Sequence, residues 1–430
     1  MRHLTLAALA LAACSSAQQP APAPTPTPEG TPDSVRGNVA ATPPTPFRIE
    51  RLQQFDAPFA MAFLPDGSLL VTEKSGALKL RAPDGAVATM TGVPAVAAGG
   101  QGGLLDVAVA PDFATSRIVY LSYAEPAAGD GSQLALARGT LNRIGPACDT
   151  PPCSAVVRLD GTQVIWRAGS PGKGGQFGAT IAFAPDDRSL FLSSGERQRF
   201  TPAQDPDQAL GKIVHLTLDG KPWPGNPAAG KAGAATVAVT DPPADTAAAA
   251  SAPVTRQPVQ GSNLAPAATW TSGHRNPYGL AFDRGGRLWE VEMGPRGGDE
   301  VNLILKGRNY GWPRASNGTN YDGLDIPDHH SGDGFEAPRL WWNPSISPGG
   351  MMIYSGAMFP QWRGDLFVAA LSGQALIRVH LSGDKASPGD QWAMGARIRD
   401  VAQGPDGAIW LIEDGGKGAG GTLLRLTPAG

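Results

Sequence analysis

A unit of two apolar strands joined by a tight polar turn recurs along most of this chain. In each copy, Val, Ile, Leu and Phe surround a turn that contains Asp, Gly or Pro, which is the pattern of a β-hairpin. Six copies occupy residues 61–73, 105–123, 179–194, 278–292, 351–371 and 398–414. Their uneven spacing leaves room for insertions between the units.

Six related hairpins without helical periodicity favour an all-β fold, a six-bladed β-propeller. A β-sandwich or a two-domain all-β protein is the alternative, and it accounts less well for six similar units. We expect the last strand, 422–428, to close the ring by pairing with a first strand near 47–55. Closure of this kind removes the exposed edges of the sheets.

The first residues read as an export signal. Arg2 precedes a short apolar run, 4–13, which is too short to span a bilayer. The run ends in Leu-Ala-Ala-Cys, which resembles a bacterial lipobox and predicts lipidation of Cys14. Ser15 after the cysteine indicates the outer membrane, so we expect a lipid-anchored protein of the periplasm or cell envelope. An ordinary cleaved signal with a chance cysteine is the alternative.

Composition divides the rest of the chain into a tether, a folded domain and an insertion within that domain. After the signal (1–14), residues 15–46 are rich in Pro, Ala and Thr and should form an extended tether. The folded domain is expected over 47–430. Within it, residues 226–266 are rich in Ala, Pro and Gly and nearly free of aromatic residues, so we expect a disordered or loosely packed loop insertion.

Charge and cysteine content narrow the possible partners and sites. The net charge is −3 and the sequence has no basic stripe or Lys/Arg block, so we expect no nucleic-acid partner. Cys148 and Cys153 are close in the sequence, and export implies an oxidising compartment. We therefore predict that they form a small disulfide. A metal site is improbable there, because no further ligand is nearby.

The richest stretch in functional groups is 272–313. It contains Arg275, Asn276, the turn 294–298, and the acids Asp299 and Glu300, with Tyr310 and Trp312 close behind. Apolar, strand-like runs separate these groups. Polar and aromatic residues that gather at strand ends predict a site on the rim of a β-scaffold, since loops on a rigid frame often carry function.

Three motifs in this stretch support a resemblance to a known family. GHRNP (273–277), GPRGGDE (294–300) and NYGWP (309–313) occur in this order. Together with GGQGGLLDVAVAPDF (99–113) and RIRDVAQGPDG (397–407), they resemble the soluble aldose-sugar dehydrogenases of the glucose/sorbosone dehydrogenase family. That family uses pyrroloquinoline quinone (PQQ) and folds as a six-bladed propeller. The resemblance covers nearly all of 47–430.

The resemblance implies a set of PQQ-binding residues. PQQ is a planar tricarboxylate, and guanidinium groups bind carboxylates through a bidentate fork. Arg275, Asn276, Arg397 and Arg399 would contact the cofactor, and Gln101 would lie near both cofactor and substrate. Arg397 and Arg399 alternate, so both should face the same side of a strand. From spacing alone, an ordinary solvated pair would be the simpler interpretation.

The resemblance also implies calcium sites, because calcium takes oxygen ligands that include backbone carbonyls. The carbonyls of Gly294 and Pro295 would bind the catalytic ion, which polarises the quinone as a Lewis acid. Glu300 and the carbonyl of Tyr310 would bind a second, structural calcium. A capped turn between blades is the alternative explanation for the acids at 299 and 300.

The proton-abstracting half of the site departs from the family. The implied reaction moves a hydride from the anomeric carbon of an aldose to the quinone while a histidine takes the hydroxyl proton. Here that position is Gln176, which cannot accept a proton near neutral pH, and Glu196 replaces the orienting aspartate. Glu196 is therefore a candidate to act through a water molecule. The alternative function is an inactive PQQ- or sugar-binding propeller; the sugar and the electron acceptor stay unnamed.

Overall fold

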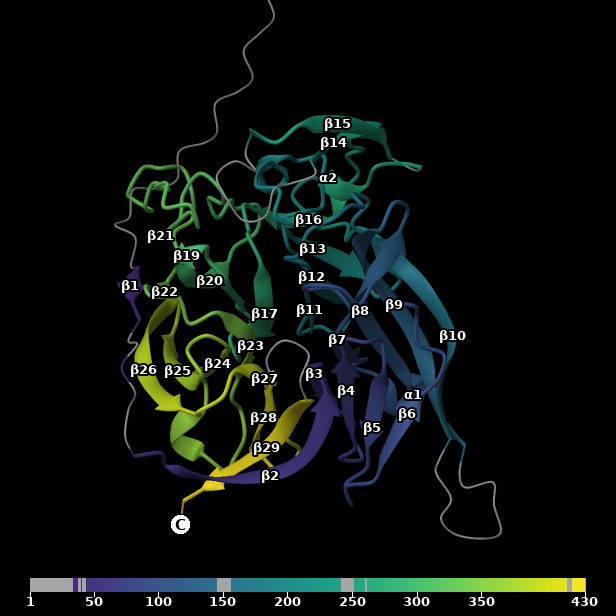
Figure 1. Ribbon diagram of the computed structural model, residues 1–430, viewed down its shortest axis with the longest axis vertical. Helices are drawn as coiled ribbons and strands as arrows, with labels where there is room; N and C mark the ends of the chain where they lie inside the picture. The colour runs from purple at the N-terminus through teal and green to yellow at the C-terminus, as the bar shows by residue number, and fades with distance from the viewer. Residues whose placement is uncertain are drawn as a thin grey trace, which may run out of the picture.

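The structure, a computed structural model, describes residues 34–37, 40, 44–144, 156–240, 251–259, 261–415 and 420–429. The predicted lipidation at Cys14 and the predicted disulfide between Cys148 and Cys153 lie outside these residues, as does most of the tether. Six sheets stand around a common centre (Figure 1). The six-bladed propeller expected from the hairpin repeats is confirmed.

The first three blades each contain four antiparallel strands, given from the centre outward. The first blade contains β3 (Pro58–Phe63), β4 (Leu69–Glu73), β5 (Leu78–Arg81) and β6 (Val87–Met90). The second contains β7 (Leu104–Val109), β8 (Ile118–Ala127), β9 (Gly131–Ile144) and β10 (Val156–Arg167). The third contains β11 (Gly178–Phe183), β12 (Ser189–Ser194), β13 (Lys212–Thr217) and β16 (Thr269–Ser272). A short helix, α1 (Phe113–Ser116), joins β7 to β8, and α2 (Ala265–Ala268) precedes β16.

The other three blades follow the same plan. The fourth blade contains β17 (Pro277–Phe282), β18 (Leu288–Glu292), β20 (Asp299–Ile304) and β22 (Leu340–Trp342), with β1 (Val35–Arg36) on the outer edge. The fifth contains β23 (Pro348–Ile353), β24 (Leu366–Ala370), β25 (Ala375–Ser382) and β26 (Lys385–Ala393). The sixth contains β27 (Ile398–Gln403), β28 (Ile409–Glu413), β29 (Gly420–Pro428) and β2 (Phe47–Asp56). A small pair, β19 (Arg296–Gly297) and β21 (Gly318–Thr319), lies beside the fourth blade.

The ring closes as the sequence predicts. Strand β2 pairs with β29 from Phe47 opposite Pro428 to Asp56 opposite Gly420, so both ends of the folded domain share one blade. The second strands of the blades are buried on both faces; every residue of β4, β18, β24 and β28 is buried. Their nearly continuous apolar sequences reflect this packing between neighbouring blades.

A register irregularity recurs in all six inner strands. It lies between the first few residues of β3, β7, β11, β17, β23 and β27 and the facing second strand. A bulge of this kind bends a strand and redirects its side chains. The residues before and within the bulges therefore form a rim at one end of the ring, from which the predicted site residues project.

The insertion at 226–266 is more ordered than its composition predicts. Strands β14 (Thr236–Thr240) and β15 (Val254–Pro258) pair along their whole length as a two-stranded ribbon. Asn226 anchors the start of the insertion by donating to the carbonyls of His215 and Ala267, each at 2.8 Å. In the described part of the insertion, amide hydrogen bonds and Val/Thr alternation supply order without a large apolar surface, while 241–250 and 260 lie outside the described residues.

Among the described residues, no helix has both the length and the apolar sequence needed to cross a membrane.

Candidate active site

The rim gathers the predicted site residues from four blades. Gln101 precedes β7, Gln176 precedes β11, Arg275 and Asn276 precede β17, and Arg399 lies at the start of β27. Glu196 N–H donates to the carbonyl of Arg275 at 2.9 Å, and Gly178 N–H donates to Asn276 Oδ1 at 3.2 Å. Residues far apart in the chain thus form one site at the end of the central channel.

Gln101 and Gln176 are in direct contact. The backbone N–H of Gln176 donates to Gln101 Oε1 at 2.8 Å, and Tyr278 Oη lies 3.4 Å from the same oxygen. Gln176 is 2% exposed and has a φ of 54°, in the left-handed region. The flanking Gly174 and Gly178 also have positive φ, which lets this loop turn sharply beneath the rim.

Glu196 lies beside Gln176 but faces its own turn. The side chain is fully buried, and its carboxylate accepts the backbone N–H groups of Gln198, Arg199 and Phe200. Three such bonds hold the turn that follows β12. Proton removal by Glu196 stays a prediction, and these contacts give its carboxylate a structural task.

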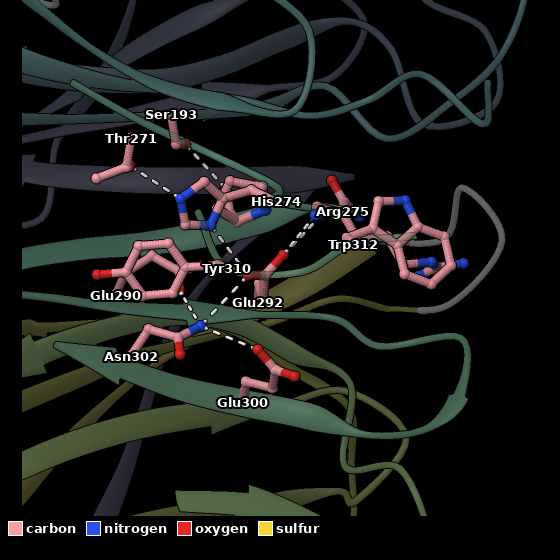
Figure 2. Close-up of polar contacts among 12 residues, drawn as sticks. Ser193, Thr271, His274, Arg275, Glu290, Glu292, Glu300, Asn302, Tyr310 and Trp312 are labelled. Carbon is pink, nitrogen blue, oxygen red and sulfur yellow. Dashed lines mark hydrogen bonds and ion pairs between the residues drawn. The ribbon is translucent and has the colours of Figure 1, made fainter. Parts of the chain in front are cut away.

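Arg275 occupies the centre of the rim. It is 4% exposed, and its Nη1 donates to the carbonyls of Met293 at 3.1 Å and Gly294 at 2.7 Å. Its guanidinium carbon lies 5.3 Å from the Trp312 ring centroid and 5.8 Å from that of Tyr321 (Trp312 in Figure 2). The carbonyl of Gly294, which is predicted to bind the catalytic calcium, therefore already has one cationic partner.

A second cationic group lies across the ring. Arg397 Nε donates to one oxygen of Asp414 at 2.9 Å, and Arg399 Nη2 donates to the other at 2.9 Å. Burial acts to raise the pKa of Asp414, but Arg399 and Arg397 hold this pKa below its usual value. The two arginines share one carboxylate, as expected for residues on the same side of the strand. The pKa of the nearby Lys74 is lowered mainly by burial and, to a smaller extent, by the charge of Arg399.

Three buried carboxylates converge on one amide beneath Arg275 (Figure 2). Asn302 Nδ2 lies 3.0 Å from Glu290, 3.3 Å from Glu292 and 3.1 Å from Glu300. His274 is fully buried; its Nδ1 lies 3.0 Å from Glu292. Possible ligand atoms of His274, Glu290 and Glu292 all lie within 4.8 Å of one another.

The electrostatics of this cluster suit a cation. Burial, followed by the charge of Glu292, raises the pKa values of Glu290 and Glu300 well above their usual value. Glu290 Oε1 is buried and has no hydrogen-bond partner among the described residues. A small cavity of about 10 Å³ is lined by Glu292, Gly294, Glu300 and Tyr310 among others. Three of the four predicted calcium-binding residues therefore meet at one cavity, and Pro295 is not among its lining residues.

The sequence identified Glu300 but missed Glu290, Glu292 and Asn302. The signal was present: Glu290 and Glu292 alternate on an otherwise apolar strand. The register of β18 and β20 places Glu292 opposite Glu300 and Glu290 opposite Asn302. Because cross-strand pairing depends on register, these neighbours become visible only with the fold.

Below the rim, the central channel holds two carboxylates. Asp106 accepts the N–H of Ile181 at 2.7 Å and Asp400 accepts the N–H of Met61 at 2.9 Å, so each joins its inner strand to the next blade. Both line a cavity of about 170 Å³. Burial raises the pKa of Asp400 to about 7, and burial together with the charge of Asp400 raises that of Asp106 to about 7.

Replacement of Asp400 by Asn should change how stability depends on pH. An aspartate whose pKa is raised on folding stabilises the fold below its unfolded pKa of about 4, and this contribution is lost as pH rises through 7. Between pH 5 and 8, the free energy of unfolding of wild type should fall by about 1–3 kcal/mol more than that of Asp400→Asn. Urea unfolding at both pH values measures this difference. Parallel pH profiles for wild type and Asp400→Asn, with exposed Asp219→Asn as control, would contradict it.

Comparisons with known proteins agree with this fold. The Glucose / Sorbosone dehydrogenase family model matches residues 55–239 and 247–425. Aldose sugar dehydrogenase YliI of Escherichia coli (strain K12) is 37% identical over 395 residues, covering 90% of this chain and 94% of the relative. The apo-form crystal structure of the soluble aldose sugar dehydrogenase from Escherichia coli superposes with a TM-score of 0.74, at 34% identity, over 89% of this chain and 99% of that one. The PQQ-bound aldose sugar dehydrogenase of Streptomyces coelicolor gives a TM-score of 0.65 at 27% identity, over 90% of this chain and 99% of that one.

Proposed function

Because the chain belongs to the glucose/sorbosone dehydrogenase family, we propose that it oxidises aldose sugars to lactones with PQQ and calcium as cofactors. The observation that carries this proposal is the gathering of cationic and polar groups around Tyr278 at one end of the channel. The Tyr278 ring lies 5.9 Å from the Arg399 guanidinium, and its hydroxyl lies 3.4 Å from Gln101 Oε1, which accepts the N–H of Gln176. Burial raises the pKa of Tyr278, while the charges of Arg399 and Arg275 act to lower it. Family relatives include a PQQ-bound aldose sugar dehydrogenase, which supports the choice of cofactor.

The residues present suit a tricarboxylate quinone. Arg397 and Arg399 share Asp414 as partner, and Lys74 lies close enough for both Arg399 and Asp414 to alter its pKa. Arg275 adds a further guanidinium between two aromatic rings. Cationic groups gathered at one site attract a multiply charged anion, and guanidinium forks can bind its carboxylates. Asn276 and Gln101 supply neutral polar contacts beside them.

The acid cluster suits calcium. Glu292, Glu300 and the backbone around Gly294 and Tyr310 offer hard oxygen atoms around a cavity of about 10 Å³. A divalent ion there would keep the carboxylates ionised and offset their mutual repulsion. PQQ, when bound, would supply a quinone that accepts a hydride, and a calcium ion at the carbonyls of Gly294 and Pro295 would polarise it. The chain itself orients the sugar at Gln101 and Gln176 and excludes water at the buried rim.

We infer that this chain differs from its family in the residue that would remove the hydroxyl proton of the sugar. Gln176 occupies the base position, and an amide cannot take the hydroxyl proton. General-base catalysis contributes about 10²–10⁴-fold, so we expect slow turnover. This same substitution supports the second candidate function, a propeller that binds PQQ or a sugar without oxidation. Export and lipid anchoring through Cys14 remain part of the proposal.

Glu300→Gln should abolish most of the stabilisation by calcium. At a hundredfold excess over its Kd, a ligand bound only to the folded state stabilises it by about 2.7 kcal/mol. The glutamine keeps the shape but removes one ligand charge, so calcium should stabilise the variant far less. In a chelator, the variant should be at least as stable as wild type, because one of three clustered carboxylates is gone.

Urea unfolding with calcium or with chelator measures both effects, and the exposed Glu50→Gln serves as a matched control. Equal calcium stabilisation of Glu300→Gln and wild type would remove this cluster as the calcium site. For the activity itself, dye reduction by the chain loaded with PQQ and calcium is measured across a panel of aldoses. Turnover with any aldose supports the dehydrogenase, and binding without turnover supports the second candidate.

A further inference from the structure

A buried histidine lies beside the acid cluster. The side chain of His329 is 2% exposed, yet neither of its ring nitrogens has a hydrogen-bond partner among the described residues. A buried polar group in this state costs free energy, and it calls for an explanation such as a bound ion. The proposed oxidation makes no use of this side chain.

One nitrogen of the ring faces a predicted calcium ligand. His329 Nε2 lies 3.9 Å from Glu300 Oε1, while Glu300 Oε2 accepts the amide of Asn302 at 3.1 Å (Glu300 and Asn302 in Figure 2). A separation of 3.9 Å is too long for a hydrogen bond. It suits two ligands of one ion, because a nitrogen and an oxygen that are each about 2.1 Å from an ion lie about 3–4 Å apart. His329 and Glu300 are thus spaced as ligands that share an ion.

The other nitrogen of the ring faces a second carboxylate. Asp333 Oδ2 lies 3.4 Å from His329 Nδ1, and this carboxylate accepts the backbone N–H groups of His330 at 3.2 Å and Phe335 at 2.8 Å. A metal-binding histidine commonly donates its second N–H to a carboxylate, which fixes the tautomer that offers the first nitrogen to the ion. Asp333, His329 and Glu300 follow one another in the order that such a site requires.

The backbone leaves room for the imidazole here. Gly311 follows Tyr310, whose carbonyl is a predicted calcium ligand, and a Cβ added at Gly311 would lie only 2.8 Å from His329 Cε1. The φ of Gly311 is 96°, in the region that favours glycine. Ser316, which lines the small cavity of the acid cluster, donates its N–H to the carbonyl of Pro327 at 3.0 Å. The loop that carries His329 is therefore tied to the wall of that cavity.

We propose that His329 is a ligand of the metal ion at Glu300, and that this nitrogen ligand lets the site take a first-row transition ion such as Ni²⁺ or Zn²⁺ as well as calcium. Calcium prefers oxygen ligands, whereas imidazole suits transition ions, for which a site with nitrogen ligands has the higher affinity. Glu300 and the carbonyl of Tyr310 would supply the oxygen atoms. The inference rests on the proposed function only for placing an ion at Glu300, and it requires neither PQQ nor a sugar.

Calorimetric titration of the full chain, without an affinity tag and freed of metal by a chelator that is then removed, tests the proposal. The probes are Ca²⁺ and Ni²⁺, added without PQQ or sugar. Ni²⁺ should bind at least about tenfold more tightly than Ca²⁺. His329→Gln keeps an oxygen donor but loses the imidazole, so it should weaken Ni²⁺ binding by about 10- to 100-fold and change Ca²⁺ binding by less than about threefold. His330→Gln, the same change at the exposed neighbour, should alter neither affinity.

Two further measurements separate a ligand from a residue that only packs. Asp333→Asn should weaken Ni²⁺ binding by about tenfold, because the ring loses the carboxylate that orients it. In the wild-type chain loaded with Co²⁺, the N–H proton of a ligating imidazole should give a strongly shifted, exchangeable signal in the proton NMR spectrum. This signal should persist in His330→Gln and disappear in His329→Gln. Its absence from the wild-type chain would count against the proposal whether or not the variants fold.

Ni²⁺ binding that is no tighter than Ca²⁺ binding, or equal Ni²⁺ affinity of His329→Gln and His330→Gln, would overturn the proposal. Dye reduction by the chain loaded with PQQ and calcium reports on the proposed function separately. Turnover without Ni²⁺ binding at His329 removes the ligand role of this histidine alone. Ni²⁺ binding that depends on His329, without turnover of any aldose, keeps the ligand role and removes the dehydrogenase.

Discussion

Gln176→His is expected to raise PQQ-dependent aldose turnover by about 10²-fold, at the lower end of the range for a general base. Histidine supplies a proton acceptor at the position where the resemblance to the family implies one. The backbone can accept it: Gln176 has a φ of 54°, and histidine is among the residues found more often in this region. The lower end applies because Glu196, at the orienting position, is hydrogen-bonded to its own turn.

The pH profile separates this effect from improved packing. Turnover by Gln176→His should rise with pH through the titration of an imidazole near 6.5, a step that wild type lacks. Gln54→His, at an exposed position of β2, is the matched control and should behave as wild type. If the variant binds PQQ but turns over no faster than its parent, proton removal does not depend on residue 176.

Arg275→Met should weaken PQQ binding by about 30- to 1,000-fold, because truncation of one partner of a buried charged pair costs about 2–4 kcal/mol. Arg275 is 4% exposed and its guanidinium lies 5.3 Å from the Trp312 ring centroid, where water screens it poorly. Its loss also frees the carbonyl of Gly294 from a cationic neighbour. Quenching of tryptophan fluorescence during a PQQ titration measures the affinity.

The control for this prediction is Arg284→Met, which removes the same charge from an exposed hairpin turn. It should bind PQQ as wild type does. Unfolding curves with calcium check that Arg275→Met remains folded. If Arg275→Met binds PQQ within threefold of wild type, then Arg275 does not hold the cofactor.

The fold could be predicted because its determinants are local. Each hairpin carries its own alternating strands and turn, as in 61–73 or 398–414, and ring closure by β2 and β29 follows from the need to cover edges. The rim residues followed from motifs such as GHRNP. Their mutual contacts, such as the bond between Gln101 and Gln176, depend on the ring bringing separate blades together.

The remaining features depend on long-range pairing that one sequence does not specify. The cluster of Glu290, Glu292 and Asn302 requires the register of β18 with β20. The order in the insertion requires Asn226 and Asn263 to bind backbone carbonyls elsewhere in the third blade, those of His215 and Asp207. Neither residue differs in the sequence from an ordinary loop asparagine.

Reduction of bound PQQ by an aldose in a single turnover tests the central claim most directly. The full chain is loaded with PQQ and calcium without oxygen, glucose is added, and the absorbance of the quinone is followed. The expected result is one PQQ bound per chain and its complete, slow reduction, about 10²-fold faster in Gln176→His. Failure of PQQ to bind in the presence of calcium would contradict both the dehydrogenase and the cofactor-binding alternative.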